Sequence, residues 1–142
     1  MKKVVLVEED KDRAEMLLEI MKNDYNIDIK LFVNAYNGYR AIVKGDYNIV
    51  LLDVMMPRIK EYEKFEYDST EIPLERGNYT GVHLLRRLKE EFKDDKNIRK
   101  YALISAQPES IIRPYIKDDY AYDRYFYKSV YTFNELAEFI NS

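Results

Sequence analysis

The stretch from residue 48 to residue 57 is NIVLLDVMMP. Its apolar part, residues 49–52, is continuous instead of alternating with polar residues, which is typical of a strand whose two faces are both buried. An aspartate, Asp53, follows this apolar part at once, and Pro57 comes four residues later. We therefore expect a central strand over residues 48–52, with Asp53 at its carboxyl end.

Similar patterns extend outward from this strand in both directions. Short apolar runs predict further strands over residues 3–7, 27–33, 101–104 and 125–127, and helical spacing predicts helices over residues 11–22, 36–44, 80–92 and 132–140. Gly45 is placed to end the second of these helices in a left-handed turn. Pro114 predicts that a helix near residues 108–118 is short, kinked or restarted. Alternating strands and helices predict an α/β fold, in which helices cover both faces of one parallel sheet.

Composition limits the functional classes. The chain has 142 residues, which fits a single domain over residues 1–142, and its formal net charge is −3. A mildly acidic chain without a basic stripe argues against direct binding to nucleic acid. The sequence has no cysteine and no apolar run of membrane-spanning length. We expect a cytoplasmic protein.

Polar side chains follow four of the predicted strands. Glu8 and Glu9 end the first strand, Asp53 the third, Ser105 the fourth and Lys128 the fifth. The carboxyl ends of parallel strands meet at one edge of a sheet, where such folds place their sites. Two charges 4 Å apart repel by about 4 kcal/mol at an effective dielectric constant near 20, so three carboxylates there call for a cation. A single acid of this kind is more commonly a helix cap or a solvated loop residue, but the combined set favours a functional site.

The chemistry of the set points to phosphoryl transfer. Oxygen ligands suit Mg²⁺. An aspartate can act as the nucleophile and form an acyl phosphate. A lysine facing the same cluster neutralises charge on the incoming phosphoryl group, which is the main task of catalysis in this reaction.

Five segments resemble the receiver domains of two-component response regulators. They are VVLVEED (4–10), NIVLLDVMMP (48–57), TGVHLLRRLKE (80–90), ALISAQ (102–107) and YFYKSV (125–130). The resemblance implies a flavodoxin-like sheet with strand order 2-1-3-4-5. It also implies a signalling phosphoacceptor that catalyses only its own phosphorylation and dephosphorylation. The implied partners are a histidine kinase or phosphotransfer protein and an unknown downstream protein, with neither nucleic acid nor membrane bound directly.

The resemblance also assigns a metal site. It implies that one Mg²⁺ or Mn²⁺ ion is held by the side chains of Glu8, Glu9 and Asp53 and by the backbone carbonyl of Met55. Glu9 departs from the family pattern, which usually has an aspartate in contact with the metal. One extra methylene shifts the ligand, and Mg²⁺ demands near-ideal octahedral geometry. We therefore expect weaker metal binding than an aspartate would give.

The same resemblance assigns the catalytic and switch residues. Asp53 is the phosphorylated residue, Lys128 and Ser105 assist, and Ser105 and Tyr125 form the switch. After Lys128 the family usually has a proline preceded by a cis bond, whereas this chain has Ser129, so we expect a differently built loop. The only histidine, His83, lies on the predicted third helix, and we expect it at the surface.

The largest departure is an insertion over residues 58–79 between the third strand and the third helix. It is interpreted either as a solvated loop whose aromatic residues pack on the domain or as a lid or docking surface beside Asp53. Two other functions remain open at this point. One is a receiver-like module that binds a protein without being phosphorylated. The other is a magnesium-dependent phosphatase or nuclease of another α/β family.

Overall fold

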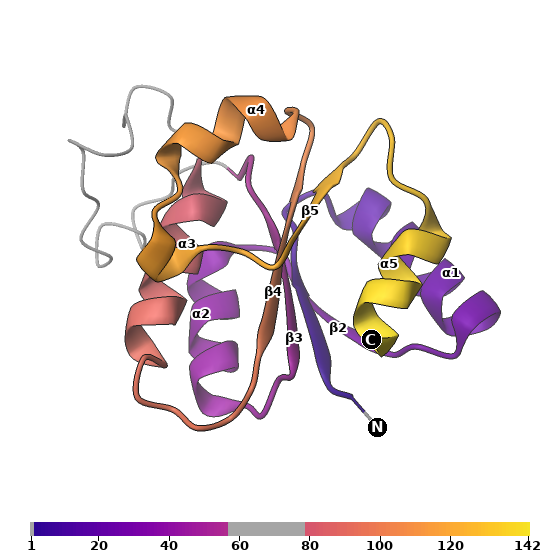
Figure 1. Ribbon diagram of the computed structural model, residues 1–142. Helices are drawn as coiled ribbons and strands as arrows, with labels where there is room; N and C mark the ends of the chain where they lie inside the picture. The colour runs from indigo at the N-terminus through magenta and orange to yellow at the C-terminus, as the bar shows by residue number, and fades with distance from the viewer. Residues whose placement is uncertain (1, 57–78) are drawn as a thin grey trace.

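The computed structural model describes residues 2–56 and 79–142 (Figure 1). Its elements, in chain order, are β1 (Val4–Val7), α1 (Lys11–Tyr25), β2 (Ile29–Phe32), α2 (Ala35–Lys44), β3 (Ile49–Asp53), α3 (Thr80–Glu91), β4 (Lys100–Ser105), α4 (Glu109–Ile112), the 3₁₀ turns η3 (Arg113–Tyr115) and η4 (Asp118–Tyr120), β5 (Arg124–Tyr127) and α5 (Phe133–Asn141). Among the described residues, no helix is long and apolar enough to cross a membrane.

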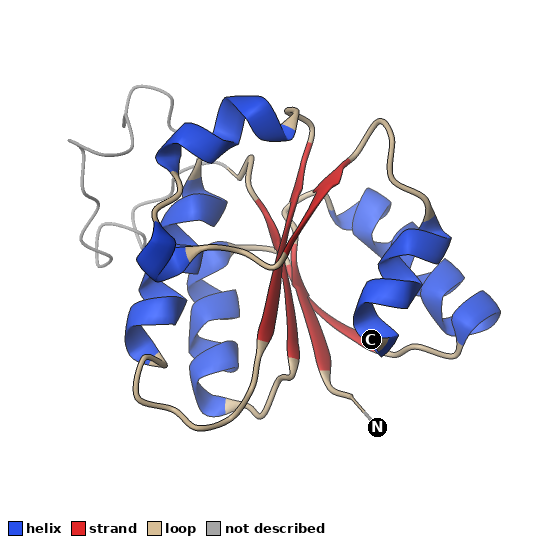
Figure 2. Ribbon diagram, in the orientation of Figure 1, coloured by secondary structure: helices blue, strands red, loops and turns tan. Residues whose placement is uncertain are grey.

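The strands form one five-stranded parallel sheet in the order β2-β1-β3-β4-β5 (Figure 2). This arrangement confirms the predicted fold class and strand order. β1 and β3 lie side by side at the point where the order reverses. The carboxyl ends of β1 and β3 therefore meet where a parallel α/β sheet places its site.

Side chains of each central strand alternate between two apolar clusters. Val5 and Val7 of β1 pack in the cluster that includes residues of α2 and α3, whereas Val4 and Leu6 pack with α1 and α5. Figure 1 shows the same division, with α2, α3 and α4 on one face of the sheet and α1 and α5 on the other. All four residues of β1 are buried, so the continuous apolar run predicts a two-sided core correctly.

The first and last helices, α1 and α5, are capped by the residues that the sequence offers as caps. Asp10 caps α1 by accepting a hydrogen bond from the backbone N–H of Arg13, at 3.2 Å. Thr132 caps α5 in the same way through the N–H of Glu135, at 3.2 Å. A side-chain oxygen satisfies one of the backbone donors that a helix start otherwise leaves without a partner.

The prediction of a left-handed turn at Gly45 is wrong. Gly45 ends α2 in an extended conformation, with φ −102° and ψ 170°. A different helix, α1, ends in the left-handed region, at Asn26, with φ 56° and ψ 41°. The N–H of Asn26 donates to the carbonyl of Lys22. Asparagine tolerates this region better than other side-chain-bearing residues, which makes it a suitable helix end.

The segment around Pro114 is broken, as the sequence predicts. α4 covers only Glu109–Ile112, and the chain continues as the 3₁₀ turn η3, which contains Pro114. A second 3₁₀ turn, η4, then brings Tyr120 into the core, where 2% of its surface is exposed and its hydroxyl donates to the carbonyl of Tyr115 at 3.0 Å. The proline therefore divides this connection into short pieces.

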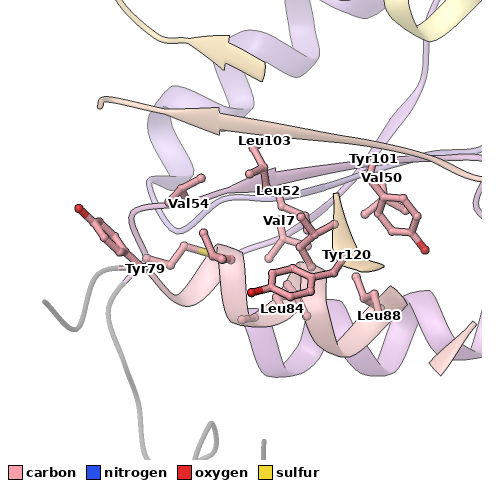
Figure 3. Packing of buried hydrophobic residues seen from close by; sticks show 14 of the residues in the cluster. Val7, Val50, Leu52, Val54, Tyr79, Leu84, Leu88, Tyr101, Leu103 and Tyr120 are labelled. Atoms are coloured by element: carbon pink, nitrogen blue, oxygen red, sulfur yellow. The ribbon is translucent and has the colours of Figure 1, made fainter. Parts of the chain in front are cut away.

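The start of α3 is more deeply buried than expected. Tyr79, just before the helix, is 6% exposed and packs its ring against Tyr115 with centroids 5.3 Å apart. Figure 3 shows Tyr79 in the same apolar cluster as Leu84. His83 is 8% exposed, so the expectation of a surface histidine is wrong. α3 contacts α2, β3 and η4, and its first six residues, 80–85, are all buried.

Candidate functional site

Four of the predicted site residues stand at the ends of four strands. Asp53 and Ser105 are the last residues of β3 and β4, and Glu8 and Lys128 directly follow β1 and β5. Since all these strands are parallel, their ends lie at the same edge of the sheet. Glu8, Asp53 and Ser105 are buried, with exposed fractions of 4%, 1% and 0%. Three polar side chains within the core mark this edge as the candidate site.

The ammonium group of Lys128 joins the two buried carboxylates. Its Nζ lies 3.3 Å from Oε2 of Glu8 and 3.4 Å from Oδ1 of Asp53. The backbone holds the lysine in place, because the N–H of Lys128 donates to the carbonyl of Ser105 at 2.8 Å. One ammonium faces two carboxylates, so the three groups together carry a net negative charge when both acids are ionised.

Burial and the neighbouring negative charge both act on the pKa of Glu8. The pKa of Glu8 is raised to about 7, chiefly by burial and also by the negative charge of Asp53, and the positive charge of Lys128 partly offsets both effects. Oε1 of Glu8 also accepts a hydrogen bond from the backbone N–H of Asp10, at 3.2 Å. Lys128 therefore does not fully neutralise Glu8 and Asp53.

The turn after β3 wraps around Asp53. Oδ1 of Asp53 accepts a hydrogen bond from the N–H of Met55, at 3.2 Å, which forms a local side-chain-to-backbone turn. The same oxygen faces Lys128, as described above. Both interactions fix the carboxylate of Asp53 and place the Met55 peptide beside it.

Glu9 lies outside this buried group. Its side chain is exposed, and its pKa is raised by partial burial and by the negative charges of Asp53 and Asp10. Within residues 2–56 and 79–142, no three acidic or histidine side chains come close enough together to hold a metal ion. Glu8 and Asp53 do fit a divalent cation such as Mg²⁺, because they offer oxygen donors and uncompensated negative charge. The full set of Glu8, Glu9, Asp53 and the Met55 carbonyl remains a prediction.

Ser105 and Tyr125 are linked through one residue that the sequence does not single out, Gln107. Its N–H donates to Oγ of Ser105 at 3.0 Å, and its carbonyl accepts from the hydroxyl of Tyr125 at 2.6 Å. Tyr125 is half-buried, and this burial raises its pKa to about 12. The hydroxyls of Ser105 and Tyr125 thus both bond to the backbone of Gln107.

A second network, also not anticipated, ties α4 to the start of β5. The hydroxyl of Tyr122 donates to Oε2 of Glu109 and accepts from Arg113 at 3.2 Å. The ring of Tyr122 packs against that of Tyr125 with centroids 5.7 Å apart. In the sequence, this network could have been suspected from Glu109 and Arg113, because oppositely charged residues four apart face each other on a helix.

Two departures from the family pattern concern the loop at Ser129 and the insertion over residues 58–79. The described residues contain no cis peptide bond, so the bond before Ser129 is trans, as expected for a loop without the proline. The insertion predicted over residues 58–79 lies outside the described residues, apart from Tyr79. Tyr79 itself forms a β-bridge with Met56 and belongs to the core.

Comparison with known proteins identifies the fold. No family model matches the chain. The transcriptional regulatory protein CusR of Escherichia coli K12 is 30% identical over 61 residues, which cover 43% of this chain and 26% of CusR. The chain therefore spans about a quarter of the length of that curated relative.

Solved structures match almost the whole chain. The receiver domain of the Francisella response regulator 1452 has a TM-score of 0.68 at 19% identity, covering 99% of this chain and 94% of that one. The response regulator TrrA of Thermotoga maritima, solved in complex with Mg²⁺-BeF, has a TM-score of 0.64 at 22% identity, with coverage of 99% and 97%. The chain has the fold of response-regulator receiver domains.

Proposed function

We propose that this chain is a phosphoacceptor receiver domain that takes a phosphoryl group from a histidine kinase or phosphotransfer protein onto Asp53. The observation that carries the proposal is the contact of Lys128 with both Glu8 and Asp53 at the carboxyl edge of the sheet. Phosphoryl transfer depends on positioning and on neutralising charge, and this buried cluster provides both. The fold shared with receiver domains supports the same function.

The proposed reaction uses the carboxylate of Asp53 as nucleophile. Oδ1 is held by Met55 and Lys128, so we assign the attack to Oδ2. The bond between phosphorus and the donor imidazole nitrogen breaks as the bond to Oδ2 forms, and the electron pair stays on the imidazole. A divalent cation held by Glu8, Glu9, Asp53 and the Met55 carbonyl would neutralise charge on the transferred group. Lys128 supplies a second positive charge from the end of β5, at the same edge of the sheet.

The proposed switch starts at Ser105. Its hydroxyl, which now accepts from the N–H of Gln107, would donate to an oxygen of the phosphoryl group. Since Gln107 also holds the hydroxyl of Tyr125, a change at Ser105 shifts the position of that ring as well. Phosphorylation would then change the population of conformations on the face formed by α4, β5 and α5, where a downstream protein binds.

Intact-protein mass spectrometry after incubation with acetyl phosphate and Mg²⁺ tests the proposal. The wild-type chain is expected to gain one phosphoryl group, and Asp53→Asn to gain none. Asp46→Asn is the matched control, because Asp46 is exposed in the loop before β3, and it should be labelled like the wild type. Labelling of Asp53→Asn at the wild-type level would refute the assignment. No labelling of the wild type would favour a receiver-like module that binds a protein without phosphorylation.

A metal-binding prediction follows from the position of Glu9. Glu9→Asp is expected to strengthen Mg²⁺ binding, because the shorter side chain is the one that suits a direct ligand at this position. Isothermal titration with Mg²⁺ or Mn²⁺ measures the effect. Glu15→Asp, an exposed change on α1, is the control and should leave the affinity unchanged. Weaker binding by Glu9→Asp would show that the longer side chain is fitted to the ion.

A further inference from the structure

A cavity of about 400 Å³ lies on the side of the sheet that α1 and α5 cover. The cavity shares Glu8 and Lys128 with the candidate site, whereas Asp53 and Ser105 do not line it, so it adjoins the site and extends beyond it. Figure 1 shows α1 and α5 packed side by side on this face, with the connection from β5 to α5 above them. We call this space the α1/α5 cavity.

The walls of the α1/α5 cavity are mainly apolar. The apolar residues of the wall include Leu6 and Ile104 of the sheet, Ala14 and Leu17 of α1, Phe133 of α5, and Tyr131 just before α5. Sites for small molecules have volumes of about 300–1,000 Å³ and combine apolar walls with a few polar groups. The α1/α5 cavity falls within this range and has room for an apolar body of modest size.

One positive charge on the cavity wall, that of Arg13, has no carboxylate partner in the part of the chain that the structure describes. Lys128 is engaged by Glu8 and Asp53, but within residues 2–56 and 79–142 no carboxylate pairs with the guanidinium of Arg13. Arg13 is exposed in the first turn of α1, held there by the Asp10 cap. A guanidinium group presents several N–H donors in one plane and matches a carboxylate or sulfonate group.

We propose that the α1/α5 cavity binds a small organic anion, whose apolar body lies between α1 and α5 and whose carboxylate or sulfonate group pairs with Arg13. This inference does not rest on the phosphoacceptor function, and its test measures binding alone. A ligand of about a dozen non-hydrogen atoms is expected to bind with a dissociation constant on the order of 1 mM.

Titration of the ¹⁵N-labelled protein with 4-phenylbutyrate, followed by NMR, tests the proposal. The backbone amides of residues 13–17, 104–106 and 128–133 are expected to shift, and those of α2 and α3 to stay in place. The neutral analogue 4-phenylbutyramide has the same size and should bind more weakly. Shifts scattered over both faces of the sheet, or no saturable shift with the carboxylate, would overturn the proposal and leave this face to a protein partner.

Two variants separate the charge from the apolar contact. Arg13→Gln is expected to weaken binding of the carboxylate about threefold to tenfold, as for a partly exposed ion pair, and to leave binding of the amide unchanged. Arg40→Gln, an exposed change on α2, is the matched control and should alter neither. Phe133→Ser should weaken binding of both compounds, since it removes part of the apolar wall. Equal affinities for carboxylate and amide in the wild type, or a carboxylate affinity that Arg13→Gln does not change, would contradict the role of Arg13.

Discussion

Replacing Lys128 with methionine is expected to slow phosphorylation of Asp53 by acetyl phosphate about 100-fold or more. Removal of one well-placed group that stabilises developing negative charge commonly costs a factor of this size. Lys128 is the only ammonium within ion-pair distance of Asp53 among the described residues, at 3.4 Å from Oδ1. Methionine keeps much of the length of the side chain and removes the charge. The rate is measured by intact-protein mass spectrometry over a time course.

Two further variants make the Lys128→Met result specific. Lys44→Met removes an exposed lysine at the end of α2 and should leave the rate unchanged. Lys128→Arg keeps the charge in a larger, planar group and should recover part of the rate. Circular dichroism confirms that each variant is folded. A folded Lys128→Met protein with a wild-type rate would remove Lys128 from the chemistry.

Replacing Gly81 with alanine is expected to destabilise the fold by about 3 kcal/mol or more, or to prevent folding, because the added carbon has no space. A Cβ at this position would lie 2.1 Å from the carbonyl oxygen of Asp53 and 2.6 Å from Cα of Val54. Both atoms belong to the backbone and cannot rotate away. The N–H of Gly81 donates to the carbonyl of Val54 at 3.1 Å, so the first turn of α3 is fastened to the end of β3.

Gly38→Ala is the matched control for Gly81→Ala. Its Cβ would lie 2.6 Å from Cγ2 and 3.1 Å from Cγ1 of Val7. These are side-chain atoms of a buried, β-branched residue, so Gly38→Ala is also expected to destabilise the fold, but by less than Gly81→Ala, whose clash is with backbone atoms. Gly38 lies within α2, where alanine is favoured over glycine by about 1 kcal/mol, and this gain offsets part of the clash. Urea unfolding of both variants measures the difference. If both variants lose the same free energy of unfolding, the close contact of α3 with β3 does not explain the loss in Gly81→Ala.

The sequence predicts those features that depend on local chemistry. Apolar runs mark the strands, and the polar residue after each run marks the edge where Glu8, Asp53, Ser105 and Lys128 come together. Pro114 breaks its helix in the structure because its missing N–H and its ring act on the adjacent turn, whatever the rest of the fold does.

Features set by tertiary packing could not be predicted in the same way. His83 is buried, and α3 contacts α2 and η4 as well as β3. The spacing of apolar residues within α3 does not reveal these neighbours. The link from Ser105 to Tyr125 passes through backbone groups of Gln107, which any residue carries. Glycine suits a left-handed helix end, but residue type alone does not require it, and Gly45 ends α2 in an extended conformation. Asn26, for which we made no prediction from the sequence, ends α1 in the left-handed one.

Locating the phosphoryl group in the chain is the most direct test of the central claim. An aspartyl phosphate is an acyl phosphate, and borohydride reduces it to an alcohol, which marks the modified residue permanently. After labelling with acetyl phosphate and Mg²⁺, reduction and peptide mapping should find this mark at position 53 and nowhere else. A mark at Glu8, Glu9 or Asp10, or a phosphoryl group that survives reduction on Ser105, would contradict the account.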